Sequence, residues 1–305
     1  MKKKRKKKVK FTIYFYILVI VVVSIFLFVF LNSDGKEENK TNNNNTNTVE
    51  KPTVKEKTEE EIKLEKLNNI NEKLDFFKME YLDRYIAYKE KNPNLDDETV
   101  VVYVNIGLDQ NFYTNVKDSP FKHTNTVLAN KYYFLGKDYV PKNLVYINSA
   151  YQSGGKQMTK DAAVAFEKMA AAAKEQGYTV RATSTYRSYD YQAGLYERYA
   201  ANDGKAKADT YSARPGYSEH QTGLAVDVDN AYSSYTSFGN TKEFTWMKQN
   251  SYKYGYILRY TKETEFITGY MNEPWHYRYV GVEIATYIHE HPMTYEEYYV
   301  RFLDK

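Results

Sequence analysis

Two short segments in the second half of the chain carry residue types that could bind a metal ion and use it. The first segment holds His220 and Asp227, seven positions apart. The second holds Glu273 and, three positions later, His276. A hydrolytic zinc site needs three protein ligands, an open coordination position for water and a nearby general base. Two histidines, one aspartate and one further carboxylate supply that set, so the two segments together predict zinc-dependent hydrolysis.

The sequence around these residues limits where their side chains point. Along residues 223–229, apolar side chains alternate with glycine, alanine and aspartate, which is typical of a strand with one face in the core. Asp227 would then face away from the core beside two very small residues, which leaves room for a metal and a substrate. Asp229 shares that face, so the alternation does not choose between the two aspartates. The proline after Glu273 favours an extended or turned backbone there, which places this carboxylate at the lip of a strand that contains His276.

The N-terminus has the composition of a membrane anchor. Residues 1–10 carry eight basic and no acidic side chains, and residues 11–31 contain no charge. A helix of that length spans about 30 Å, the thickness of the hydrocarbon core of a bilayer. Because basic residues favour the cytoplasmic side, we expect a cytoplasmic segment over 1–10, a single transmembrane helix over 11–31 and the rest of the chain outside the cell. The length of the apolar run favours an uncleaved anchor over a cleaved signal peptide.

Charge and cysteine content exclude several classes of function. The whole chain has a net charge of +4, but 35 basic and 39 acidic residues remain once the eight basic residues of the N-terminus are set aside. Binding to nucleic acid is therefore not expected. The chain has no cysteine, which excludes disulfides, thiolate metal ligands, a thiol nucleophile and a lipidated cysteine. No protein partner can be identified from the composition.

Two segments lead from the predicted anchor to the predicted catalytic domain. Residues 32–57 are polar and almost free of large apolar side chains, which predicts a disordered tether. Residues 58–129 are expected to form a helical lead-in and the N-terminal part of the ectodomain. Apolar and aromatic side chains recur there at three- and four-residue steps, typical of an amphipathic helix that either packs on its own domain or pairs with a partner helix. These side chains are Leu67, Ile70, Leu74, Phe77, Tyr81 and Tyr85.

Residues 130–305 are expected to form the catalytic domain, and the elements in and before it alternate irregularly. The β-branched run 99–106 predicts a strand. The alanine-rich run 160–176 predicts a helix that ends before Gly177. Further strands are expected at 180–184, 256–260 and 277–280, and further helices at 191–199 and 282–289. This order predicts an α+β fold with a central, mainly antiparallel sheet flanked by helices.

The motifs are similar to those of a known family. They comprise Ser218-x-His220-x-x-Gly223-x-Ala225-x-Asp227, Glu273-x-x-His276, residues 184–188 with Gln192, residues 213–217 and residues 256–260. Together they resemble the signature of the VanY-type zinc D-Ala-D-Ala carboxypeptidases, which are related to the VanX dipeptidases and to L,D-carboxypeptidases of the peptidoglycan. The resemblance covers roughly residues 76–305.

The resemblance implies a role for each residue of the two opening segments. His220, Asp227 and His276 would bind one zinc ion per chain, which selects Asp227 over Asp229. Glu273 would be the general base that takes a proton from the attacking water.

The resemblance also implies roles for residues outside these segments. Arg187 would stabilise the oxyanion, although it could instead form a salt bridge beneath the turn at Tyr186. Gln192, Ser218 and Arg214 are expected to bind substrate. Arg214 could clamp a terminal carboxylate with two hydrogen bonds, or it could have a structural role. Ser218 is expected to orient the site and is not expected to be a nucleophile.

The implied function is that of a membrane-anchored zinc metallocarboxypeptidase, a metalloprotease that removes the C-terminal D-alanine from peptidoglycan stem peptides of the cell wall. One alternative keeps the chemistry but cuts an L,D bond in tetrapeptide stems. Another is a non-catalytic wall-binding module of the same fold. The intact Glu273 argues against the second alternative, because a site that only binds has no need of a base.

Overall fold

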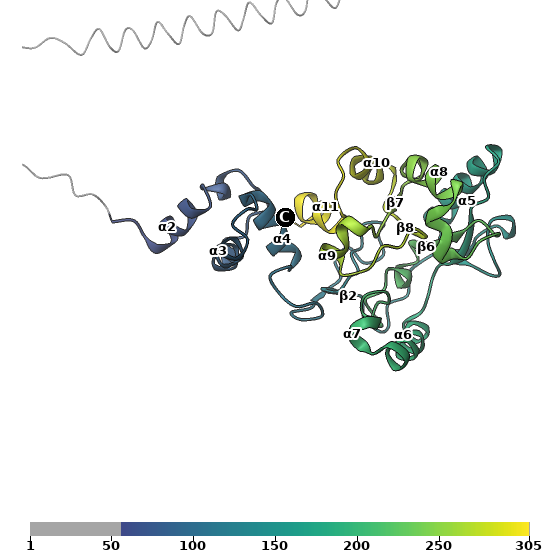
Figure 1. Ribbon diagram of the computed structural model, residues 1–305, viewed down its shortest axis with the longest axis horizontal. Coiled ribbons are helices and arrows are strands. Elements are labelled where there is room, and N and C mark those ends of the chain that lie inside the picture. The colour runs from purple at the N-terminus through teal and green to yellow at the C-terminus, as the bar shows by residue number, and fades with distance from the viewer. Residues whose placement is uncertain (1–55, 305) are drawn as a thin grey trace, which may run out of the picture. The chain divides into compact units, whose positions relative to one another are not determined.

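The computed structural model describes residues 56–304 of the chain. The predicted cytoplasmic segment 1–10, the predicted transmembrane helix 11–31 and nearly all of the predicted tether 32–57 lie outside these residues. Within the described part, no helix is both long and apolar enough to cross a membrane. The chain from Lys57 onward groups into one structural unit, shown as the coloured ribbon in Figure 1. The expected boundary between residues 129 and 130 stays a prediction.

An antiparallel sheet forms the centre of this unit. Its four strands follow the order β5-β6-β8-β7, and every neighbouring pair is antiparallel. Two smaller two-stranded sheets occur in the described residues: β1 pairs with β2 in parallel, and β3 pairs with β4 antiparallel. The strands are β1 (Lys117–Asp118), β2 (Tyr133–Phe134), β3 (Leu144–Tyr146), β4 (Gln157–Thr159), β5 (Arg181–Ser184), β6 (Ala225–Asp229), β7 (Tyr256–Leu258) and β8 (His276–Tyr279).

Helices surround the sheet and complete the expected α+β architecture. The predicted helices at 160–176, 191–199 and 282–289 are present as α5, α6 and α10, with bounds that differ by a few residues. The helices of the described residues are α2 (Glu59–Lys66), α3 (Leu82–Lys91), α4 (Asp97–Ile106), α5 (Lys160–Glu175), α6 (Tyr189–Asp203), α7 (Lys205–Ala208), α8 (Lys242–Asn250), α9 (Glu265–Thr268), α10 (Val282–Glu290) and α11 (Tyr295–Phe302).

One buried cluster joins the apolar face of β6 to α5 and α8. Val226 and Val228 of β6 are fully buried in it together with Phe166 of α5 and Met247 of α8, and Figure 1 shows these elements side by side. The alternation expected along 223–229 is confirmed, because the valines enter the cluster. The opposite face of β6 is left for Asp227.

A second cluster joins the lead-in helices to α10 and α11, and it corrects the prediction of a strand at 99–106. That segment is helical and forms α4. Asp96 caps its N-terminus, accepting a hydrogen bond from the backbone N–H of Thr99 at 2.8 Å, and Gly107 ends it with φ of 111°. The valines of α4 are buried on every side of the helix. A helix buried all round loses the polar face by which helical periodicity is recognised, so its β-branched composition was misleading.

The aromatic and apolar residues between 67 and 85 also pack into this second cluster. Leu67 and Tyr85 are both fully buried there. The expectation that this segment packs on its own domain is confirmed. The single amphipathic helix is wrong, because α2 and α3 are separated by turns and two short 3₁₀ segments, Ile70–Glu72 and Met79–Tyr81.

Candidate metal centre and active site

Two neighbouring strands and the turn before one of them bring the predicted ligands together. Asp227 of β6 lies directly opposite His276 of β8 in the antiparallel ladder. His220 lies in the 3₁₀ segment Glu219–Thr222, just before β6. Ser218 begins this segment, and its Oγ accepts a hydrogen bond from the backbone N–H of His220 at 3.3 Å. Gly223, with φ of 70°, ends it and turns the chain into β6.

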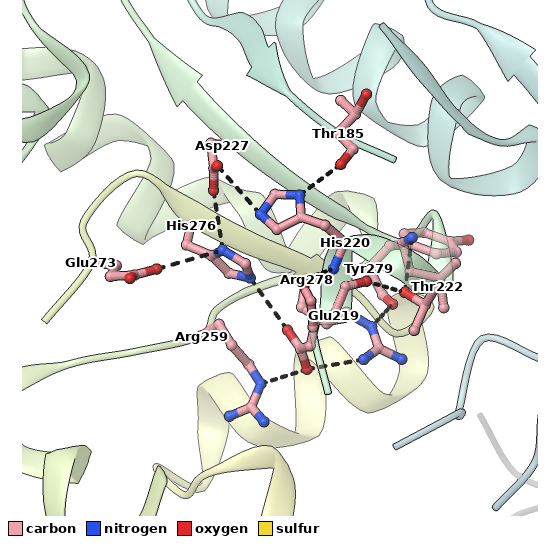
Figure 2. A network of polar contacts seen from close by, with 12 residues as sticks. Thr185, Glu219, His220, Thr222, Asp227, Arg259, Glu273, His276, Arg278 and Tyr279 are labelled. Carbon is pink, nitrogen blue, oxygen red and sulfur yellow. Dashed lines mark hydrogen bonds and ion pairs between the residues drawn. The ribbon is translucent and has the colours of Figure 1, made fainter. Parts of the chain in front are cut away.

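The candidate ligand atoms of these three residues converge. One ring nitrogen of each histidine and one carboxylate oxygen of Asp227 lie within 4.8 Å of one another. The Nε2 atom of His220 lies 3.3 Å from Asp227 Oδ2, and the Nδ1 atom of His276 lies 3.1 Å from Asp227 Oδ1. Figure 2 shows both rings turned toward the same carboxylate.

The hydrogen bonding of these atoms fits a metal ion. His220 Nε2 and Asp227 Oδ1 are buried and have no hydrogen-bond partner, and a buried polar atom without a partner is costly. The other ring nitrogen of His220, Nδ1, lies 2.7 Å from the carbonyl oxygen of Thr185. Nδ1 therefore carries the proton, and Nε2 presents its lone pair toward Asp227. Two imidazole nitrogens and one carboxylate oxygen form a donor set that suits zinc and leaves a coordination position open.

Burial and neighbouring charges shift the pKa values of these groups in different directions. Burial, together with the nearby charge of Arg187, lowers the pKa of His220 to about 4, so this ring is neutral at physiological pH. Burial also lowers the pKa of His276, but the neighbouring carboxylates of Asp227 and Glu219 outweigh it and raise this pKa to about 9. Burial opposes ionisation of Asp227, yet the two histidines hold its pKa well below the usual range. Asp227 is therefore ionised, and its carboxylate faces a ring nitrogen of each histidine.

Glu273 lies beside the convergent ligands, as the sequence predicts for a base. Its Oε2 atom is 3.6 Å from His276 Nδ1, and the residue is 8% exposed. Burial raises the pKa of Glu273 to about 7, although the nearby His276 draws it down. A carboxylate with a pKa near the working pH can both accept and return a proton.

Arg187 reaches the same centre from the loop after β5. Its guanidinium donates to Asp227 Oδ2 at 3.1 Å and to Gln192 Oε1 at 3.0 Å. Its salt-bridge partner is thus a predicted metal ligand. Gln192 is buried and also donates to the carbonyl oxygen of Ala213 at 2.8 Å. Gln192 therefore holds Arg187 in place and does not line the cavity, whereas Ser218 does line it.

The structure does not bring Arg214 or Asp229 into the centre. Arg214 forms two hydrogen bonds with Asp209, at 3.0 and 2.8 Å, and stacks on the ring of Tyr113. This arginine lines a different cavity, so the geometry favours the structural alternative over the carboxylate clamp. Asp229 is held by two hydrogen bonds from Arg181, both of 3.0 Å. Asp227 is the aspartate that converges with the two histidines.

A cavity of about 700 Å³ opens onto the convergent ligands. Besides the residues of the centre, its lining is rich in aromatic side chains from α6 and from the loops around β6 and β8. These include Tyr191, Tyr199, Tyr211, Tyr235 and Trp275. The cavity is large enough to admit the end of a peptide chain.

Sequence reasoning missed a buried charge network beneath the centre. Glu219, Arg259 and Arg278 meet there, with no side-chain exposure at any of the three. The signal for it was an arginine in β8 and another just after β7, both flanked by aromatic and apolar residues. Arginines inside apolar strands require buried acidic partners, and Glu219 precedes a predicted ligand directly.

The sequence is similar to those of known carboxypeptidases. The sequence profile of the family described as VanY, D-alanyl-D-alanine carboxypeptidase, matches residues 155–282. A putative carboxypeptidase of Bacillus subtilis, YodJ, is 42% identical over 179 residues, which is 56% of this chain and 66% of that protein. A D-alanyl-D-alanine carboxypeptidase of Enterococcus faecalis is 41% identical over 136 residues, 42% of this chain and 50% of that protein. The chain thus matches less than two thirds of the length of these curated relatives.

Solved structures extend the comparison. The LD-carboxypeptidase LdcB is 39% identical, with a TM-score of 0.55, over 61% of this chain and 93% of that one. VanYB, solved in complex with D-alanine-D-alanine, is 34% identical, with a TM-score of 0.50, over 57% of this chain and 96% of that one. A D,D-pentapeptidase VanY solved with Zn(II) shows the same identity and TM-score. Nearly the whole of each of these proteins is matched, and the chain therefore belongs to the VanY family of D-alanyl-D-alanine carboxypeptidases.

Proposed function

We propose that this protein is a zinc carboxypeptidase that removes the C-terminal D-alanine from peptidoglycan stem peptides. The observation that carries the proposal is the convergence of His220, Asp227 and His276 at one cavity. Two of their candidate ligand atoms are buried without a hydrogen-bond partner, and Glu273 and Arg187 line the same cavity. Family membership supports it, as does the Zn(II) found in a VanY neighbour.

The predicted ligands, Glu273 and Arg187 have separate roles in hydrolysis. Bound to His220, Asp227 and His276, zinc would supply a Lewis acid and lower the pKa of a coordinated water to about 7. Glu273 accepts the proton of the attacking water and then donates it to the departing amine of D-alanine. The guanidinium of Arg187 stabilises the negative charge that develops on the carbonyl oxygen.

Removal of D-alanine from tetrapeptide stems is the second candidate function. LdcB, a structural neighbour, is an LD-carboxypeptidase, whereas VanYB was solved with D-alanine-D-alanine. We favour the D,D activity because the family profile and the Enterococcus relatives carry that description. The two activities differ in the configuration of the residue before the cleaved bond.

One assay separates these functions. The full-length chain, loaded with zinc, is incubated with a defined pentapeptide stem ending in D-Ala-D-Ala and, separately, with the tetrapeptide stem, and the released alanine is measured. We expect alanine from the pentapeptide, with the tetrapeptide as product. Release from the tetrapeptide alone would establish the L,D activity. No release from either, with zinc bound, would support a wall-binding module and overturn the proposal.

A variant of the predicted base tests the mechanism. Glu273→Gln keeps the shape of the side chain but cannot accept a proton, so we expect zinc to be retained and D-alanine release to fall by about 10²–10⁴-fold. Glu263→Gln, an exposed carboxylate in the loop after β7, is the matched control and should retain full activity. Full activity in Glu273→Gln would show that another group is the base.

We also propose that residues 11–31 anchor the protein in the cell membrane and that residues 32–57 hold the catalytic domain outside it. The support is the uncharged run of 21 residues behind eight basic ones. A domain on a tether of that composition would be able to search the neighbouring cell wall.

A further inference from the structure

Glu219 has a fully buried carboxylate that no step of the proposed reaction uses. It lies directly before His220 in the chain, but its side chain turns toward the other histidine of the centre. Its Oε2 atom is 3.3 Å from Nε2 of His276. Its Oε1 atom accepts hydrogen bonds from Arg259 at 2.8 Å and from Arg278 at 3.0 Å. Figure 2 shows this carboxylate between the two guanidiniums and the ring.

The two arginines are themselves held by the surrounding structure. Arg259 donates two further hydrogen bonds, of 2.9 and 2.6 Å, to Glu296 of α11. Arg278 donates to the carbonyl oxygens of Val127 and Asn125 at 2.6 and 3.1 Å. Two carboxylates and two guanidiniums thus balance within one buried network. Buried charges are tolerated when they are paired and hydrogen-bonded in this way, so Oε2 of Glu219 has a fixed position.

That fixed position decides how the ring of His276 can act. Nδ1 of His276 faces Asp227, while Nε2 faces Glu219. A carboxylate accepts hydrogen bonds and cannot donate them when ionised, so Nε2 keeps its proton when the ring gives up one of its two. Nδ1 is then the nitrogen that presents a lone pair toward Asp227 and the centre. In His220, the backbone carbonyl of Thr185 holds the ring proton on Nδ1 in the same way, which leaves the lone pair on Nε2.

We propose that Glu219 is a positioning residue of the metal centre: it accepts the Nε2 proton of His276 and so fixes the ring with Nδ1 free to bind zinc. Arg259 and Arg278 keep the Glu219 carboxylate in place by donating hydrogen bonds to its Oε1 atom. The inference rests on the proposed zinc site. The contrasting explanation is that the network only stabilises the fold.

Two matched variants distinguish a positioning role from a structural one. In Glu219→Gln, the two guanidiniums keep the amide oxygen on their side, because they can only donate. The amide nitrogen then faces Nε2 of His276 and donates to it, which moves the ring proton to Nδ1, the ligand atom. In Glu296→Gln, the same network loses one negative charge, but no atom in contact with His276 changes.

Zinc affinity, measured on the full-length protein by competition with a chelator, is the deciding readout. We expect Glu219→Gln to weaken zinc binding by about 10–100-fold, the usual effect of losing a partner of a metal-bound histidine. The visible absorption of bound cobalt(II) should change as well. Glu296→Gln should keep zinc affinity within about threefold of wild type, although urea unfolding should show that both variants are destabilised.

Two outcomes would overturn the inference: wild-type zinc affinity in Glu219→Gln, or equal losses of affinity in both variants. A second measurement needs no variant, in case Glu219→Gln does not fold. With ¹⁵N-labelled histidine in the zinc-loaded wild type, we expect a slowly exchanging proton on Nε2 of His276, and zinc bound to Nδ1 of that ring. Zinc on Nε2 would refute the role of Glu219. Neither readout depends on D-alanine release, so failure of the proposed function would be seen separately.

Discussion

Two buried carboxylates contact the same histidine and yet differ in protonation behaviour. Burial opposes ionisation of Glu219, but Arg259 and Arg278 hold its pKa well below the ordinary value. Glu273, on the other side of His276, has no guanidinium at hydrogen-bonding distance in the described residues, and burial raises its pKa to about 7. Environments that separate two pKa values in this way assign separate roles. The permanently charged carboxylate suits positioning, and the titrating one suits proton transfer.

The activity should therefore depend on pH through Glu273. A base must be ionised to accept a proton, so kcat/KM is expected to fall as the pH decreases through the pKa of Glu273. Because the charge of bound zinc favours the carboxylate form, this fall should lie at or below the value of about 7 found without the ion. The check is kcat/KM for the pentapeptide stem between about pH 5 and 8. A rate that stays constant or increases toward low pH would contradict this assignment.

The residue types of the two segments predicted a zinc centre, and the family resemblance assigned its ligands, but the pairing of charges could not be predicted. His220, Asp227, Glu273 and His276 do converge. The strand alternation did not exclude Asp229 as a metal ligand, but its carboxylate forms a salt bridge with Arg181. The sequence does not show which oppositely charged residue a given side chain will contact in the folded protein.

At the scale of elements, the sheet and α5 were predictable because each keeps one apolar face. β6 alternates strictly, and α5 repeats small and apolar residues on the side that enters the cluster. α4 was not predictable by this means, because Val100, Val101, Val102 and Val104 are buried around the whole helix. Its cap residues, Asp96 and Gly107, were the better signal.

Packing of α5 against the sheet should account for much of the stability of the domain. Phe166 is fully buried between the strands and this helix, whereas Val164 of the same helix is 42% exposed. We expect Phe166→Ala to lower the free energy of unfolding by about 3–5 kcal/mol, because it removes a large buried side chain and leaves a cavity. Val164→Ala should change it by no more than about 0.5 kcal/mol. Urea unfolding would measure both, and equal effects would mean that α5 does not anchor the core.

At the scale of the whole molecule, the metal centre depends on parts of the chain outside the segment that matches the family profile. That segment comprises residues 155–282. Arg259 is held by Glu296 of α11, and Arg278 by carbonyl groups near residue 127. A fragment limited to 155–282 would lack these supports, although it would contain every predicted ligand.

The proposed anchor has a direct test on the whole chain. We expect the full-length protein to sediment with membranes and to remain there after a high-salt wash, because an apolar segment of about 20 residues inserts stably into a bilayer. A form that lacks residues 1–31 and is exported by a cleavable signal should be recovered in the medium. If the protein is expressed with its own N-terminus and recovered from the medium in a shortened form, residues 11–31 are a cleaved signal peptide.

The pairing of Asp227 with His276 across β6 and β8 links metal binding to the register of these two strands. Successive side chains of a strand point to opposite faces, so a slip of one residue would turn one of these two ligands away from the other. Such a chain could not gain the binding free energy of the ion. Metal binding would therefore favour the native pairing of β6 with β8 over a slipped one.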